Sequence, residues 1–126
     1  VVKGLVWSDQ QIDEAFRFDI MEAELVVNNA VKTRLTQCMF DALVSFAFNV
    51  GPGKRGIKDG FVSLKSGGPS TMLKLLNIGA FESVTREFVK WNRAGGMVVN
   101  GLTIRREKEA KLYARDRFPV LEYLTP

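Results

Sequence analysis

The sequence feature that most constrains the fold is residues 37–50, which predict a helix that is apolar on nearly every side. Thr36 stands just before this segment and can cap its first turn. A helix that is apolar all round is stable only when other elements cover it. Three polar residues interrupt its surface, and because they lie four apart they form one stripe: Asp41, Ser45 and Asn49. We therefore expect a protein built around a central buried helix.

Shorter periodic segments predict further helices around this central one. Ser8 can cap a first helix, in which apolar residues recur every three or four positions: Ile12, Phe16, Ile20, Ala23 and Val27. Ser70 can cap a short helix, and Thr103 can cap a last helix that ends near Ala114. Residues 81–91 predict one more amphipathic helix from the spacing of their apolar residues: Phe81, Val84, Phe88 and Trp91.

Glycines mark the parts of the chain that are not helical. Residues 51–68 hold six glycines in 18 positions, which oppose a regular helix. Within them, residues 61–64 alternate apolar and polar side chains and predict one short strand. The pair Gly95 and Gly96 predicts a turn. The expected fold class is mainly α, with about five helices and one long Gly-rich loop or short hairpin.

The ionisable residues exclude several classes of site. The chain has no histidine and a single cysteine, Cys38, which excludes Ser-His-Asp and Cys-His catalysis and any disulfide within the chain. We expect no metal site and no cofactor, since the usual zinc ligands are missing. A formal charge of +4 suits an anionic partner such as a bacterial wall or a nucleic acid without requiring one, and of these we do not expect nucleic acid. No apolar run is long enough to span a membrane.

Three groups of charged or reactive residues have a simpler interpretation than catalysis. Glu22 and Glu24 lie two apart, so they do not face each other on a helix and indicate a solvated face. Cys38 follows a helix cap, where a thiol can be activated, but a small inert thiol is the favoured interpretation. Two basic runs predict solvated faces and local ion pairs, such as Arg105 with Glu109, in preference to phosphate contacts.

Two segments carry side chains suited to a ligand. Asn49 ends the polar stripe beside Gly51, where its amide can meet either a ligand or solvent. Residues 91–96 place Trp91, Asn92 and Arg93 before a Gly-Gly turn. Saccharide sites use flat aromatic rings against sugar faces and amides against hydroxyls. Trp91 also continues an apolar period, which favours a position in the core.

Three blocks occur in an order that resembles the phage-type lysozymes, glycoside hydrolase family 24: residues 35–51 (LTQCMFDALVSFAFNVG), residues 69–77 (PSTMLKLLN), and residues 87–96 (EFVKWNRAGG) with the following GL and RRE. The resemblance extends over most of the chain, from about Ser8 to Ala114. It implies the helical lobe of the lysozyme-like fold. The activity that it implies is cleavage of the glycosidic bond between the amino sugars of peptidoglycan, during host lysis by a phage or prophage.

The resemblance assigns a binding surface but no catalytic residue. The family motif places a catalytic Glu near its N-terminus, followed by Asp or Cys and then Thr, and no such segment is recognisable in this sequence. We therefore expect the chain to be inactive alone. On or behind the side of the substrate cleft that the helical lobe forms, we expect five matching residues: Asn49, Thr71, Met72, Trp91 and Asn92.

Two functions remain open at this stage. The first is an endolysin that acts on peptidoglycan, and the second is a non-catalytic, lysozyme-derived protein that binds and inhibits a host enzyme or defence complex. We expect residues 1–126 to form one domain, with residues 51–68 as an insertion and residues 116–126 as a C-terminal tail that either packs on the lobe or binds a partner. The expected location is the host bacterial cytoplasm, with action at the cell wall after release.

Overall fold

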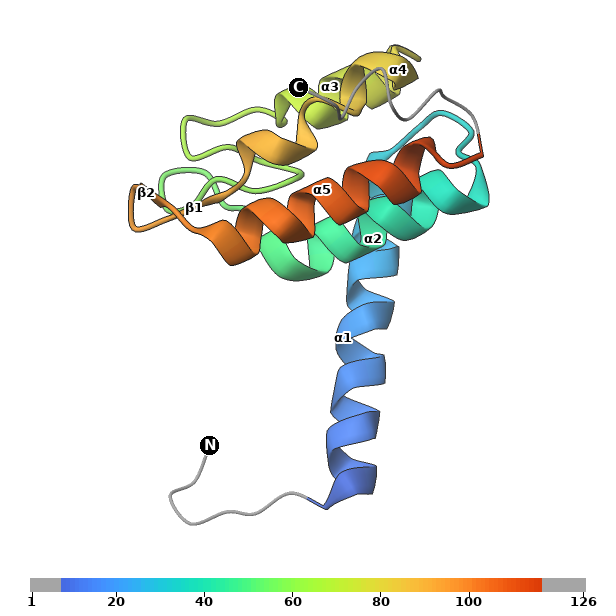
Figure 1. Cartoon of the computed structure of the whole chain (residues 1–126), viewed down its shortest axis with the longest axis vertical. Coiled ribbons are helices and arrows are strands. Elements are labelled where there is room, and N and C mark those ends of the chain that lie inside the picture. Colours follow the sequence, from blue (N-terminus) through green and yellow to red (C-terminus); the bar gives the residue numbers. More distant parts are fainter. Residues whose placement is uncertain (1–7, 117–126) are drawn as a thin grey trace.

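The computed structural model describes residues 8–116, and within them the chain is mainly helical (Figure 1). In chain order the elements are α1 (Asp9–Ala30), α2 (Gln37–Val50), α3 (Thr71–Asn77), α4 (Phe81–Val84), the 3-10 helix η1 (Phe88–Lys90), β1 (Arg93–Ala94), β2 (Met97–Val98) and α5 (Asn100–Ala114). The prediction of a mainly α chain with about five helices is confirmed. No helix within residues 8–116 combines the length and the apolar character needed to cross a bilayer.

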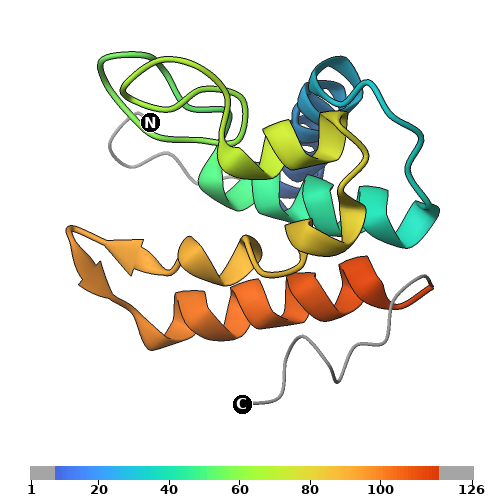
Figure 2. The same ribbon diagram turned by 90° about the horizontal axis from the view of Figure 1, so that it is seen from above.

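Helix α2 is the centre of the structure. It packs most extensively against α5 and next against α1, and Figure 2 shows α5 running alongside it. Thr36 caps it by accepting a hydrogen bond from the Met39 N–H at 3.2 Å. Its buried residues occupy most of its circumference: Met39, Ala42, Leu43, Val44, Phe46 and Ala47. The prediction of a central buried helix with a Thr36 cap is confirmed.

The aromatic ring of Phe46 joins α2 to the segments that follow it. Phe46 is fully buried, and its edge-to-face partners are the rings of Phe61, Phe88 and Trp91, with centroids 5.5–6.1 Å away. Such pairs contribute roughly 0.5–1.5 kcal/mol each beyond the area they bury. Because the Gly-rich loop and the η1 segment both meet on this one ring, Phe46 fixes where the loop and Trp91 lie relative to α2.

Helix α1 begins as predicted but buries only part of its apolar face. Ser8 and Gln11 form a reciprocal capping box at its first turn. Ala23 and Val27, near its C-terminal end, are buried. Ile12 and Phe16, on the same apolar period, are each 54% exposed. Figure 1 shows the reason, because the first turns of α1 project away from the other helices.

The Gly-rich loop contains no strand at residues 61–64, so that prediction is wrong. The N–H groups of Phe61, Val62 and Ser63 donate to the carbonyls of Gly51 and Pro52, so this backbone folds back on the end of α2 and has no partner strand. Elsewhere in the Gly-rich loop, the strand-like pairing is a single antiparallel bridge between Lys54 and Lys58.

Two glycines allow this fold-back. A Cβ at Gly53 would lie 2.5 Å from the backbone nitrogen of Gly60, and a Cβ at Gly60 would lie 2.1 Å from that of Gly53. Gly53 also has a φ of +82°, which is strained for other residues. The two backbones therefore touch at positions where side chains do not fit.

Residues 81–91 do not form the single helix that the apolar spacing predicts. α4 ends at Val84, a turn follows, and η1 begins at Phe88. The linking hydrogen bonds span three residues, as in Glu87 N–H to the Val84 carbonyl and Trp91 N–H to the Phe88 carbonyl. Val84 and Phe88 are buried nonetheless. The spacing predicted the buried side correctly and the helix type wrongly.

The turn at Gly95 and Gly96 is confirmed, and it closes the β1–β2 hairpin, in which Arg93 pairs with Val98. The cap predicted for the last helix is wrong. α5 begins at Asn100 after Val99, and its cap has no side-chain hydrogen bond. The hairpin sets this earlier start, because the Val99 N–H donates to the Asn92 carbonyl at 2.9 Å and extends the hairpin to the edge of the helix. Thr103 consequently lies inside the first turns of α5.

Candidate functional site

A cleft opens at the end of the molecule where α2 ends. Its volume is about 500 Å³, within the range of roughly 300–1,000 Å³ that is usual for ligand sites. Figure 2 shows the Gly-rich loop and the β1–β2 hairpin at this same end, on opposite sides of α2. The residues that line the cleft come from five segments: Asn49, Val50, Lys58, Asp59, Lys90, Trp91, Arg93, Leu102 and Arg106.

Asn49 and Trp91, two residues predicted for a binding surface, lie together in this cleft. Asn49 is exposed near the end of α2, and no other described residue holds its amide by a hydrogen bond. Trp91 is half-buried, with its ring packed at 89° against Phe46 at a centroid distance of 5.5 Å. Part of Trp91 thus packs on the core, as its apolar spacing indicated, and part of it lines the cleft, while its role in binding stays a prediction.

The other three predicted site residues do not line the cleft. Asn92 is half-buried, and its amide donates to Thr103 Oγ1 at 3.0 Å, which ties the start of the hairpin to α5. Met72 is buried in the core on α3, and Thr71 is exposed on the same helix. Of these, Asn92 is the chain neighbour of Trp91 and Arg93 in the cleft, and Met72 is a core packing residue. Their roles in binding stay predictions.

A buried ion pair forms the support behind the cleft. Arg106 Nε lies 2.7 Å from Glu109 Oε1, and the Nη2 group donates to Oε2 at 3.1 Å. Ser45 of the polar stripe donates to Glu109 Oε2 at 2.6 Å, and Arg105 reaches the same oxygen at 3.5 Å. Burial lowers the pKa of Arg106, and Glu109 opposes that shift. Arg106 also lies over the Phe46 ring, 5.2 Å from its centroid.

The sequence predicted only part of this network. The predicted ion pair of Arg105 with Glu109 is confirmed, but the solvated face predicted for the basic run does not include Arg106, which is fully buried in its own local pair with Glu109. The available signal was the separation of three residues between Arg106 and Glu109, which places both on one helix face. The predicted stripe of α2 divides accordingly, because Ser45 turns to this pair while Asp41 and Asn49 remain exposed.

The carboxylates near the described cavities are either exposed or already paired. Asp59 is the single carboxylate among the residues lining the cleft, and its Oδ1 accepts the Lys65 N–H at 2.6 Å. Glu22 is exposed, as predicted, and with Asp19 it lines a separate pocket between α1 and the end of α2. Glu24 is half-buried. Within residues 8–116, no three His, Cys, Asp or Glu side chains gather as metal ligands do.

Cys38 sits at the first turn of α2 and is half-buried. Partial burial, together with a hydrogen bond to the Asp116 carboxylate and its negative charge, raises the pKa of the thiol. The Asp116 carboxylate shifts the other way. Desolvation by burial raises its pKa, but hydrogen bonds from Thr36 and Cys38 outweigh this, and the pKa of Asp116 is lowered. A thiol with a raised pKa carries less thiolate at neutral pH, which agrees with an inert role.

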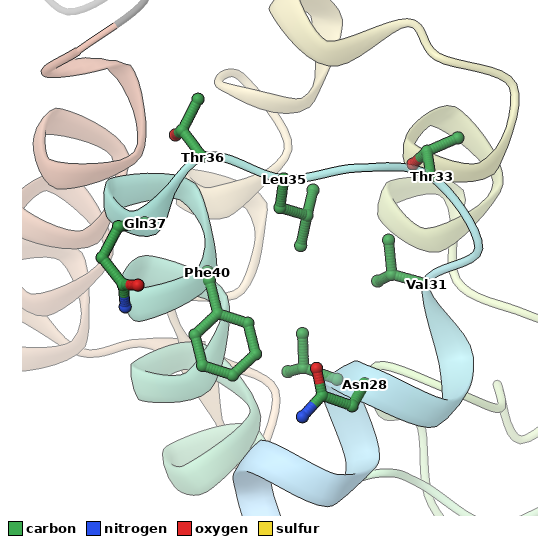
Figure 3. A pocket seen from close by; sticks show the side chains of 8 residues that line it. Asn28, Val31, Thr33, Leu35, Thr36, Gln37 and Phe40 are labelled. Carbon is green, nitrogen blue, oxygen red and sulfur yellow. The ribbon is translucent and has the colours of Figure 1, made fainter.

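A second pocket lies between the end of α1 and the start of α2, with a volume of about 330 Å³ (Figure 3). Leu35 and Phe40 point into it. The hydroxyl of Thr33 is already used, because it donates to the Leu76 carbonyl at 2.7 Å, and the Gln37 amide donates to Asp41. Four of the eight residues that line this pocket are polar, and of these only Asn28 has no side-chain hydrogen bond to another residue within 8–116.

A helical lobe with a cleft at the end of its central helix is the architecture of a lysozyme-like protein. The family model described as Phage lysozyme matches residues 1–109. The chain therefore belongs to the phage lysozyme family, and the resemblance stated from the sequence is confirmed.

Individual relatives agree with this assignment. The chain is 44% identical to an endolysin of Bacillus phage B103 over 108 residues, which are 86% of this chain and 36% of that protein. Among solved structures, the active form of the P1 phage endolysin Lyz matches with a TM-score of 0.72 and 27% identity, over 90% of this chain and 64% of the other. The muramidase domain of SpmX from Asticaccaulis excentricus matches with a TM-score of 0.70 and 30% identity, over 90% and 72% of the two chains. The chain thus spans about a third of the curated endolysins that it matches first.

Proposed function

We propose that this helical lobe binds the glycan strand of peptidoglycan in the cleft between the Gly-rich loop and the β1–β2 hairpin, as one part of a phage muramidase. The observation that carries the proposal is the meeting of Asn49 and Trp91 in one cleft, although they are far apart in the sequence. Relatives named as endolysins, and a structural neighbour named as a muramidase domain, support the same substrate. Such a protein is made in the host cytoplasm and acts at the cell wall after release.

The chemistry of the two side chains suits a sugar chain. The ring of Trp91 is held rigidly by Phe46, so little entropy is lost when the flat face of a pyranose packs on it. The free amide of Asn49 offers both donors and an acceptor to hydroxyl or acetamido groups. Neither group performs bond cleavage, so the two account for binding and positioning only.

We also propose that residues 8–116 bind glycan without cleaving it. Glycoside hydrolysis generally needs a carboxylic acid that protonates the leaving oxygen and a second group across the bond. Asp59 faces the cleft but is exposed and engaged by the Lys65 N–H. The buried carboxylates Glu87 and Glu109 are ion-paired and do not line the cleft. Binding of a host protein in place of glycan is the competing outcome that the following experiment separates.

The test is the affinity of the 126-residue chain for chitotetraose, a neutral chain of the same amino-sugar type. We expect Asn49→Ala to weaken binding about threefold to tenfold through the loss of one hydrogen bond, and Trp91→Leu to weaken it at least about tenfold. Asp41→Ala is the matched control, because Asp41 lies exposed on the same helix stripe and away from the cleft. Equal affinities in all four folded proteins, or no binding at all, would remove the cleft as a glycan site.

A turbidity assay on isolated cell walls tests the second part of the proposal. The chain is expected to sediment with the walls and to leave their turbidity unchanged. Clearing of the walls by this chain would show that an acid outside the set described above performs the cleavage.

A further inference from the structure

The cleft carries positive charge that its own carboxylates do not neutralise. Among the cations that line it, Arg106 is paired with Glu109, and Lys90 Nζ lies 2.7 Å from Glu87 Oε2. Lys58 and Arg93 have no carboxylate partner among residues 8–116. Asp59 is the one acidic residue of the lining. Two cations therefore face the cleft without a paired anion.

Local hydrogen bonds define the chain around these two cations. Lys58 closes a tight turn, in which its carbonyl accepts the Lys54 N–H at 2.7 Å and its N–H donates to the Lys54 carbonyl at 2.9 Å. Its ammonium group lies over the end of α2, since a Cβ built on Gly51 would be 3.8 Å from Lys58 Nζ. The guanidinium of Arg93 donates to the Gly96 carbonyl across the hairpin turn at 3.3 Å. The local backbone therefore sets where both side chains leave the chain, on the lining of one cleft.

We propose that Lys58 and Arg93 form an anion subsite that binds a carboxylate of the peptide attached to the glycan strand. The proposal rests on the function proposed above, because the glycan at Trp91 brings the peptide to this side of the cleft. In peptidoglycan the short peptides branch from the sugar chain and carry free carboxylates, so an anion beside a bound sugar is a property of this polymer. The Gly-rich loop supplies one of the two cations, which gives this loop a role in choosing the substrate.

The experiment compares three soluble probes: chitotetraose, which is neutral; a disaccharide-peptide fragment of peptidoglycan with free carboxylates; and the same fragment with its carboxylates amidated. Lys58→Gln and Arg93→Gln are each expected to weaken binding of the free-carboxylate fragment about threefold to tenfold. Affinity for chitotetraose and for the amidated fragment is expected to stay within twofold of the unmodified protein. Raising the salt concentration should reduce the difference between the probes, because exposed charges are screened.

Two further variants make the result specific. Lys54→Gln is the matched control, since Lys54 is an exposed lysine of the same loop that does not line the cleft. Lys58→Arg keeps the charge and is expected to keep most of the affinity. A Lys58→Gln protein that binds the free-carboxylate fragment as tightly as the unmodified protein would overturn the proposal. So would equal losses for the neutral and the charged probes. A parallel titration uses poly(glycerol phosphate), the chain of a wall teichoic acid, and a loss of affinity confined to that polymer would also overturn the proposal.

The outcome for chitotetraose separates this inference from the function on which it rests. Absence of chitotetraose binding by the unmodified protein would refute the glycan site itself. If the unmodified protein binds chitotetraose, but Lys58→Gln and Arg93→Gln leave the affinity for the free-carboxylate fragment unchanged, only the anion subsite is refuted.

Discussion

Helices α1 and α2 both carry large apolar side chains at helical spacing, yet these side chains end in different environments. In α2, Met39, Leu43 and Phe46 are fully buried. In the first half of α1, Ile12 and Phe16 are more than half exposed, and Phe16 makes one aromatic contact, with the Phe48 ring at 5.6 Å. The spacing of apolar residues therefore predicts which side of a helix favours burial. The arrangement of the other elements decides whether that side is covered.

The difference between the two helices has an energetic consequence. Burying a large apolar side chain contributes roughly 1.5–3 kcal/mol relative to leaving it in water. In α2, buried side chains along most of the helix contribute this free energy, whereas in α1 the buried residues are Ala23 and Val27. We therefore expect the stability of residues 8–116 to depend on α2 and its neighbours far more than on the projecting turns of α1.

The largest expected effect comes from matched deletions of one phenyl ring in each helix. Phe46→Ala should lower the free energy of unfolding by about 3–5 kcal/mol, because it empties the point where three aromatic rings from two other segments meet. Phe16→Ala should lower it by at most about 1 kcal/mol, since the ring is half exposed already. Urea denaturation of both variants measures the two losses in the free energy of unfolding. Equal losses would contradict the conclusion that α2 contributes more to stability than the first turns of α1.

A somewhat smaller loss is expected at the buried ion pair of α5, which contacts α2 through Ser45 and Phe46. Arg106→Met leaves the buried Glu109 with only the longer contact to Arg105 at 3.5 Å, and we expect a loss of about 3 kcal/mol in the free energy of unfolding. The double variant Arg106→Met with Glu109→Leu should recover most of that loss, because it removes the uncompensated charge. The same urea experiment reports both values. A double variant no more stable than the single one would mean that the contacts of these two side chains to Ser45 and Phe46 of α2 contribute more than charge compensation does.

Two serine caps extend the comparison to hydrogen bonds. Ser70 is buried, accepts the Leu73 N–H at 3.1 Å and donates to the Phe61 carbonyl at 2.7 Å, so it caps α3 and holds the Gly-rich loop. Ser8 caps α1 in full exposure. Ser70→Ala is expected to cost about 1–2 kcal/mol, and Ser8→Ala about 0.5 kcal/mol. Thermal unfolding of the two variants, compared with the unmodified chain, tests this order.

The smallest expected effect is kinetic and concerns the thiol at the start of α2. Because burial and Asp116 raise the pKa of Cys38, its reaction with iodoacetamide should reach half its maximal rate at a higher pH than that of a cysteine in a short peptide. Asp116→Asn removes the negative charge and should move that midpoint to lower pH. A midpoint at or below the peptide value would show that the thiol is activated, contrary to its inert role.

The sequence predicted those parts of the fold whose signals are local. The caps at Ser8, Thr36 and Ser70 and the turn at Gly95 and Gly96 each depend on residues within one turn, and all are confirmed. The strand expected at residues 61–64 failed for a non-local reason. Its N–H groups bond to Gly51 and Pro52, and the ring of Phe61 is buried against Phe46.

The candidate site divides in the same way. Asn49 and Trp91 were singled out by residue type and by family resemblance, and the structure brings them into one cleft. Arg93 was singled out with Trp91, but its place in one cleft with Lys58 was not predicted, since nothing in the sequence shows that the Gly-rich loop and the hairpin lie at the same end of α2. The burial of Arg106 was missed because a run of basic residues is typical of a solvated face. The C-terminal tail lies beyond Asp116, outside the described residues.

The central claim is that the cleft beside Asn49 and Trp91 receives a sugar chain, and a titration of the isotope-labelled protein with chitotetraose, followed by nuclear magnetic resonance, tests it most directly. The account predicts that the largest shifts fall on the Trp91 indole and the Asn49 side-chain amide, with the exposed turns of α1 unaffected. Shifts centred on the pocket between α1 and α2, or on Phe16 and its neighbours, would contradict it.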